Sequence, residues 1–309
     1  MKEKYSLKGI VVSLNTPFDH AGHIDLDSLA RAVEMHIQEG ASGFLSPAQA
    51  AEVGALSLSE RIEMIRFVQQ LVRGRATYIA SATSTDEKES FAVAEAAVAA
   101  GCEAVLLEFP ERVRGNHAAT VELCQSIARV GMPVLVLQDL DWNGSGVEVP
   151  WIVELFETIE SFRCLKVEVR PAGPKYSQVI AATGGRLTVA GGWAADQMIE
   201  ALDRGVDIYM PTTMTRFYNL VVRNHAAGNR EAAKLWFYRI LPVLAFTRQH
   251  LDISIQFHKR QLHHRGIFAT PIVRKKCVPY DAYHEKYGEE MIRYLDTLEE
   301  LAEQEGSMS

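Results

Sequence analysis

The sequence contains little cysteine and no hydrophobic segment long enough to span a bilayer. Its four cysteines form no Cys-x-x-Cys pair, and they are Cys102, Cys124, Cys164 and Cys277. Because a chain of this size can bury a sufficient core without cross-links, we expect reduced, mostly buried thiols. The first residues also lack the apolar core of a secretory signal. These absences argue against a membrane span and against export. They predict a cytoplasmic location.

Basic charge is scarce as well. The chain has 32 lysines and arginines against 39 acidic residues, a formal net charge of -7. An acidic surface repels phosphate backbones, which argues against a nucleic-acid or anionic-membrane partner. The composition, 48% hydrophobic and 23% charged, is typical of a globular protein with a sizeable core. A small molecule is therefore the expected partner.

Short runs rich in valine, isoleucine and leucine alternate with longer amphipathic segments. Predicted strands cover residues 9–16, 43–47, 77–82, 104–110, 133–139, 164–168, 187–192 and 207–212. Predicted helices between them include 28–38, begun by Asp27, then 57–72 and 86–100. Several strands are apolar on both faces, as in parallel strands covered by crossover helices. This pattern predicts an α/β fold, a (β/α)₈ or TIM barrel.

More helix follows the last predicted strand than a barrel needs for closure. Helical patterns cover residues 231–250, 254–265 and 283–304. No low-complexity tract or Gly/Ser-rich linker separates them from the rest. We expect a barrel over residues 1–228 and a C-terminal helical bundle over 229–309, packed on it as one structural unit.

The sixth predicted strand contains a lysine within an apolar run. Strand alternation directs Lys166 and Glu168 to the same side, the barrel mouth where active sites of this architecture lie. A lysine amine attacks a carbonyl only when it is uncharged, and burial disfavours its charged form. We therefore interpret Lys166 as a Schiff-base lysine. The alternative from position alone is a structural ion pair that fills the barrel.

Other polar or small residues are expected at the same end of the barrel. The fifth strand ends in Gln138 and Asp139, which an ordinary strand cap would also explain. Small residues after the second strand would let backbone N–H groups approach a substrate carboxylate. The residues expected to bind substrate are Asp139 together with Gln49, Ala50, Ala51, Gly191 and Gly192. For Tyr209, Thr212 and Thr213 on the eighth strand, substrate binding and barrel packing are both open.

These motifs resemble the dihydrodipicolinate synthase and N-acetylneuraminate lyase family of class I aldolases. The resemblance extends over essentially the whole chain: residues 9–18 end in Thr-Pro-Phe, and Glu52, Leu56-Ser57 and Glu60-Arg61 follow the second strand in the family's frame. Leu165-Lys166 matches the strand that carries the family's Schiff-base lysine. The resemblance implies a covalent imine at Lys166 without a metal or other cofactor, a 2-oxo acid substrate, and a homo-oligomer, either a tetramer or a dimer.

The chain departs from the family at its proton-relay tyrosines. Gln138-Asp139 replaces Tyr-Asn on the fifth strand, and Pro110-Glu-Arg112 replaces Pro-Tyr-Tyr after the fourth. The branch of 2-keto-3-deoxy-L-arabonate dehydratases is more similar, since it shares Gln-Asp and a Lys-x-Glu sixth strand. This resemblance implies a hydro-lyase in which Glu168 moves the protons and Gln138 assists.

Two other functions stay open. The first is a pyruvate-dependent aldolase or dihydrodipicolinate synthase-like enzyme, which shares the imine. The second is a non-catalytic relative that binds a 2-oxo acid. A metal site at His258, His263 and His264 is not expected, because these residues do not share one helix face; a solvated face or a subunit contact is the expected role of this segment.

Overall fold

The strands close into a parallel barrel surrounded by helices. The computed structural model describes residues 3–110, 113, 115–192, 195–275 and 277–307. The closed barrel runs in chain order and consists of β1 (Gly9–Ser13), β2 (Gly43–Ser46), β3 (Thr77–Ser81), β4 (Ala104–Glu108), β5 (Val134–Leu140), β6 (Phe162–Glu168), β7 (Thr188–Gly191) and β8 (Ile208–Tyr209). The predicted TIM barrel is confirmed. The predicted eighth strand was too long, since β8 contains two residues.

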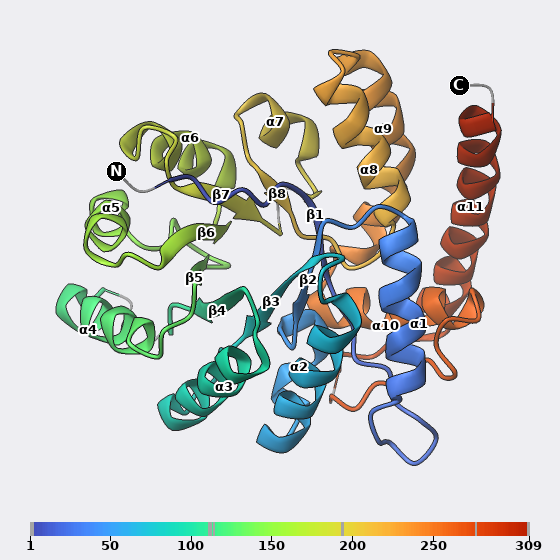
Figure 1. Ribbon diagram of the computed structural model, residues 1–309. Coiled ribbons are helices and arrows are strands. Elements are labelled where there is room, and N and C mark those ends of the chain that lie inside the picture. The colour runs from blue at the N-terminus through green and yellow to red at the C-terminus, as the bar shows by residue number, and fades with distance from the viewer. Residues whose placement is uncertain (1–2, 111–112, 114, 193–194, 276, 308–309) are drawn as a thin grey trace.

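Each strand is followed by helix, and the helices form the outer ring in Figure 1. They are α1 (Leu26–Gln38), α2 (Leu58–Val72), α3 (Glu87–Ala100), α4 (His117–Ala128), α5 (Val149–Thr158), α6 (Ala172–Ala182), α7 (Met198–Asp203) and α8 (Thr215–Ala226). Ser57 and Glu60 form a capping box at the start of α2. Asp25, rather than the expected Asp27, caps α1 by accepting from the Ser28 N–H.

Two hydrophobic layers follow from the alternation along the strands. Side chains of one parity fill the barrel interior, among them Leu106, Val136 and Cys164. Those of the other parity, including Leu137 and Leu165, pack against the helices. A polar side chain on a strand therefore lies inside or outside the barrel according to its parity.

The N-terminal segment closes the end of the barrel opposite the mouth. Figure 1 shows it passing β7 and β8 before entering β1. Tyr5 and Leu7 are buried in the interior cluster. The Tyr5 carbonyl accepts from the Thr188 hydroxyl at 2.9 Å, and Lys4 pairs with Asp207 at 2.8 Å. Segment 3–8 is thus the floor of the barrel.

Three further helices follow the barrel: α9 (Arg230–Thr247), α10 (Leu251–His264) and α11 (Ala282–Ser307). They lie beside α8 and α1 in Figure 1, and α10 also contacts the short 3₁₀ turn η1 (Gln49–Ala51) that follows β2. The described helices include none that is long and apolar enough to cross a membrane. The expected thiols are free; Cys277 is partly exposed and the other three are buried.

Candidate active site

The interior side chains of adjacent strands bring Lys166, Gln138 and Glu168 together. Gln138 on β5 is paired in register with Lys166 on β6, and both are nearly fully buried. Glu168 lies one interior position further toward the mouth. Its Oε2 is 3.4 Å from Lys166 Nζ and accepts a 2.5 Å hydrogen bond from Gln138 Nε2. These are the three side chains for which the sequence predicts chemistry.

Gly192 leaves the space that the Glu168 carboxylate occupies. A Cβ at residue 192 would lie 1.8 Å from Glu168 Oε1 and 3.0 Å from its Cδ. Any other residue would displace the carboxylate, so Gly192 positions Glu168 by having no side chain. Gly191 lies within β7, paired with Tyr209, whose side chain belongs to the outer layer. Alternation therefore turns Gly191 away from the mouth.

The loop after β2 is held rigidly at the barrel rim. Asn15 Nδ2 donates to the Ala50 carbonyl and Thr16 Oγ1 to the Ala51 carbonyl, both at 2.7 Å. The Ala51 N–H donates to Ala48 O within the turn, so it is already engaged. Ala51 is fully buried, whereas Gln49 is exposed at the mouth and reaches Glu108.

A buried ion pair fixes this loop to the C-terminal helices. Glu52 follows η1 in the left-handed conformation, with φ of 57°, and its carboxylate pairs with Lys259 on α10. The other carboxylate oxygen accepts from the backbone N–H groups of Arg274 and Lys275, each at 2.8 Å. Burial lowers the pKa of Lys259 to about 8, against the opposing attraction of Glu52. The sequence offered no signal for this contact between residues so distant in the chain.

Asp139 does not lie in the mouth, and its expected contact with substrate is wrong. Its parity is that of the outer layer, and it is almost fully buried. The carboxylate lies 3.2 Å from Lys175 Nζ on α6 and accepts from the Val147 N–H at 3.0 Å. Asp139 therefore anchors the loop after β5 to the barrel wall. A charge buried without such partners would be strongly unfavourable.

The residues of β8 and the segment after it are used in packing. Tyr209 belongs to the outer cluster and donates to the Val206 carbonyl at 2.8 Å. Thr213 Oγ1 lies 2.8 Å from His258 Nδ1. Burial lowers the pKa of His258 to about 3, so this histidine is neutral near pH 7. Of the two interpretations that the sequence left open for Tyr209 and Thr213, substrate binding and barrel packing, these contacts favour packing.

Two carboxylates near the mouth were missed from the sequence. Glu108 ends β4 on the interior face and is paired in register with Gln138. Asp196, in the segment after β7, accepts from Arg248 Nε at 2.7 Å. Burial raises the pKa of Asp196 to about 6, although Arg248 opposes the shift, and the charge of Glu168 adds to it. Glu111 and Arg112, which replace the family's tyrosines, lie outside the described residues.

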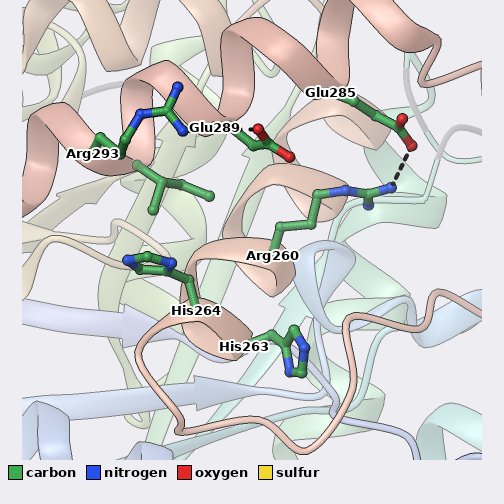
Figure 2. Close-up of a pocket in the computed structure, with 7 residues that line it drawn as sticks. Arg260, His263, His264, Glu285, Glu289 and Arg293 are labelled. Atoms are coloured by element: carbon green, nitrogen blue, oxygen red, sulfur yellow. Dashed lines mark hydrogen bonds and ion pairs between the residues drawn. The ribbon is translucent and has the colours of Figure 1, made fainter.

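A separate cavity of about 650 Å³ lies between α10 and α11. Figure 2 shows that two histidines and charged side chains of both signs line it: His263, His264, Arg260, Arg293, Glu285 and Glu289. Arg260 pairs with Glu285 at 3.5 Å, and His264 pairs with Asp296 at 2.9 Å. Among the described residues, no group of three or more His, Cys, Asp or Glu side chains could hold a metal ion.

Related proteins are similar to this chain either over about a third of its length or over nearly all of it. A 4-hydroxy-tetrahydrodipicolinate synthase from Pseudomonas aeruginosa is 38% identical over 104 residues, which are 34% of this chain and 36% of that protein. A synthase of the same name from Xanthomonas campestris is 24% identical across 97% of this chain and 98% of its own length. An N-acetylneuraminate lyase from Salmonella paratyphi B is also 24% identical, across 97% of each chain.

Solved structures share the architecture. The 4-hydroxy-tetrahydrodipicolinate synthase from Methylacidiphilum fumariolicum has a TM-score of 0.86 at 20% identity, over 97% of this chain and 99% of that one. A prophage protein of the dihydrodipicolinic acid synthase family from E. coli K12, in complex with pyruvate, has a TM-score of 0.85 at 16% identity, over 94% and 99%. The Dihydrodipicolinate synthetase family model matches residues 6–295, and the chain belongs to this family.

Proposed function

We propose that the protein is a lyase that binds a 2-oxo acid as an imine on Lys166 and dehydrates a 2-keto-3-deoxy sugar acid. One observation carries the proposal: a buried lysine shares the barrel mouth with a carboxylate at 3.4 Å, and Gln138 holds that carboxylate. The amine forms the covalent intermediate, and the carboxylate lies where it can exchange protons with the carbon next to the imine.

The chemistry needs no metal or redox cofactor. The Lys166 amine adds to the C2 carbonyl of the substrate, and loss of water leaves a protonated imine. Glu168 then removes a proton from C3, and the electron pair enters the imine to form an enamine. Return of this pair expels the hydroxyl group from C4, which leaves as water with the proton that Glu168 carried. Hydrolysis of the imine frees the product and the lysine.

We assign the substrate carboxylate to the loop after β2. Ala50 and Ala51 have small side chains, and Asn15 and Thr16 hold their carbonyls in place. A fixed loop lowers the entropic cost of orienting the substrate. In this assignment the carboxylate lies near Ala50 and Gln49, and the chain of the substrate extends from Lys166 past Gln138.

Borohydride reduction of the protein with pyruvate or a 2-keto-3-deoxy acid tests the imine. The expected result is a stable mass increase equal to the reduced substrate, on a peptide that contains Lys166. Absence of an adduct with every 2-oxo acid would reject the imine.

Product analysis separates the reactions: release of pyruvate would favour the aldolase alternative, whereas loss of water without chain cleavage supports dehydration. Adduct formation without turnover would favour the non-catalytic alternative.

Glu168→Gln should retain imine formation and lose most turnover, by roughly 10²- to 10⁴-fold, because an amide cannot accept the C3 proton. The substitution preserves shape but leaves Lys166 without its counter-ion, so the free energy of unfolding should fall and is measured alongside. Trapping yield and kcat are measured on the same preparation. Unchanged turnover would remove Glu168 from the mechanism.

Gly192→Ala should lower turnover by about tenfold or more, because the added methyl group displaces the Glu168 carboxylate from its position beside Lys166. Gly54→Ala is the matched control, since a Cβ at residue 54 has no atom within 4 Å. Steady-state kinetics of both variants check the prediction. Equal kcat values for Gly192→Ala and Gly54→Ala would contradict it.

A further inference from the structure

We propose that Ser81 is a further substrate-binding residue, whose hydroxyl group donates a hydrogen bond to the C1 carboxylate of the 2-oxo acid. The inference rests on the proposed function, since it requires a substrate held on Lys166. It starts from one unsatisfied atom. Ser81 is fully buried, and its hydroxyl has no hydrogen-bond partner among the described residues. A buried hydroxyl without a partner is unfavourable, so a ligand that supplies the partner is favoured at this position.

The strand register directs Ser81 into the barrel, close to the reactive lysine. Ser81 ends β3, and its register partner Leu106 belongs to the interior cluster. Leu106 pairs in turn with Val136 on β5, and Gln138 lies two positions further along that strand. In a barrel of this kind the rows are staggered by about one residue per strand, so that alternate strands contribute to one layer. Ser81 and Gln138 therefore share a layer, next to Lys166, the register partner of Gln138.

Ser81 also lies beside the loop to which the substrate carboxylate is assigned. Ser46, the last residue of β2, is paired with Ala80, so the chain enters this loop next to Ser81. Residues 47–51 of the loop contain no hydroxyl group, and the Ala51 N–H donates within the turn. An ionised carboxylate only accepts hydrogen bonds, so it needs several donors around it. The Ser81 hydroxyl supplies a donor from the neighbouring strand.

The interior is accessible at this depth. Lys166 and Ser13 are 5% and 7% exposed, and Ser13 faces the interior as its register partner Leu45 does. The stagger that relates Ser81 to Gln138 also places Ser13 in their layer. In the closed order of the eight strands, β2 lies opposite β6. A substrate attached to Lys166 on β6 therefore directs its carboxylate across the barrel, toward the side formed by β1, β2 and β3.

Borohydride trapping with pyruvate, or with the shortest 2-oxo acid that forms an adduct, tests the assignment. Pyruvate has little more than the carboxylate and the carbonyl group. In Ser81→Ala the pyruvate concentration for half-maximal trapping should rise about tenfold, because a hydrogen bond to a charged group is lost. Ser81→Cys keeps a similar volume with only a weak donor and should show the same loss. Ser90→Ala, at a serine that is 3% exposed on the outer helix α3, should match the wild type.

Two further measurements separate substrate binding from a structural role. Hydroxyacetone is a ketone without a carboxylate, so its half-maximal concentration should be the same in Ser81→Ala and the wild type. Without a ligand, Ser81→Ala should unfold at the same or a higher temperature, because its hydroxyl has no partner to lose.

The outcomes distinguish this inference from the proposed function. A wild-type adduct together with an unchanged pyruvate concentration in Ser81→Ala overturns this inference alone. An equal rise for hydroxyacetone, or a lower unfolding temperature of the free variant, would indicate a structural role and would overturn it too. No wild-type adduct with pyruvate or any other 2-oxo acid overturns the proposed function, and this inference with it.

Discussion

Lys166→Met should abolish turnover, by at least about 10³-fold, and should eliminate borohydride trapping entirely. Methionine fills a similar volume without an amine, so no imine can form. The substitution also removes one charge of the buried Lys166–Glu168 pair. Intact-protein mass after reduction and a product assay measure the two effects. Lys166→Arg should be equally inactive, because a guanidinium group stays protonated and does not attack a carbonyl.

Folding must be shown to survive these substitutions. The circular dichroism spectrum of Lys166→Met should resemble that of the wild type, since the thioether suits a buried site, whereas its thermal unfolding should occur at a lower temperature, because Glu168 loses its partner. Trapping that persists in Lys166→Met would contradict the assignment of the nucleophile. Mapping the reduced peptide would then identify another lysine.

Lys259→Met should lower the free energy of unfolding by about 3–5 kcal/mol. Lys259 and Glu52 are both completely buried, and removing the lysine leaves the Glu52 carboxylate in the interior without a counter-ion. The loop after β2 would then lose its tie to α10. Chemical denaturation measures the loss.

Lys234→Met is the matched control. Lys234 pairs with Glu231 on the surface of α9, and Glu231 is 83% exposed. Surface pairs of this kind contribute about 1 kcal/mol or less. If both variants lost the same stability, the buried pair would have no special role. At temperatures where Lys259→Met stays folded, we also expect a raised KM, because the loop after β2, to which the substrate carboxylate is assigned, loses its tie to α10.

Alternation along the strands explains what was predictable from the sequence. Because side chains of one parity share a face, a lysine in an apolar strand with Glu168 two positions later is enough to predict that the two side chains lie together at the mouth. The same rule would have found Glu108, which has the parity of the interior residues Ala104 and Leu106. It would also have excluded Asp139, which is adjacent to Gln138 and hence on the opposite face.

Contacts between distant segments were beyond the sequence. The pair Glu52–Lys259 joins residues separated by 207 positions, and neither residue is marked by a local pattern. The anchoring of Asp139 by Lys175 likewise depends on how α6 packs on the barrel. Periodicity reports the face on which a side chain lies, whereas the partner it meets follows from tertiary packing.

Segment 3–8, the floor of the barrel, closes the end opposite Lys166. Tyr5 and Leu7 fill the interior below the strands, and the hydrogen bond from Thr188 ties the segment to β7. In the proposed reaction, the reactant, the product and the water used in hydrolysis would therefore all pass through the mouth at the other end. If the imine forms as proposed, a substrate in the mouth shields it from premature hydrolysis, and departure of the product is then a step that can limit the rate of a complete cycle.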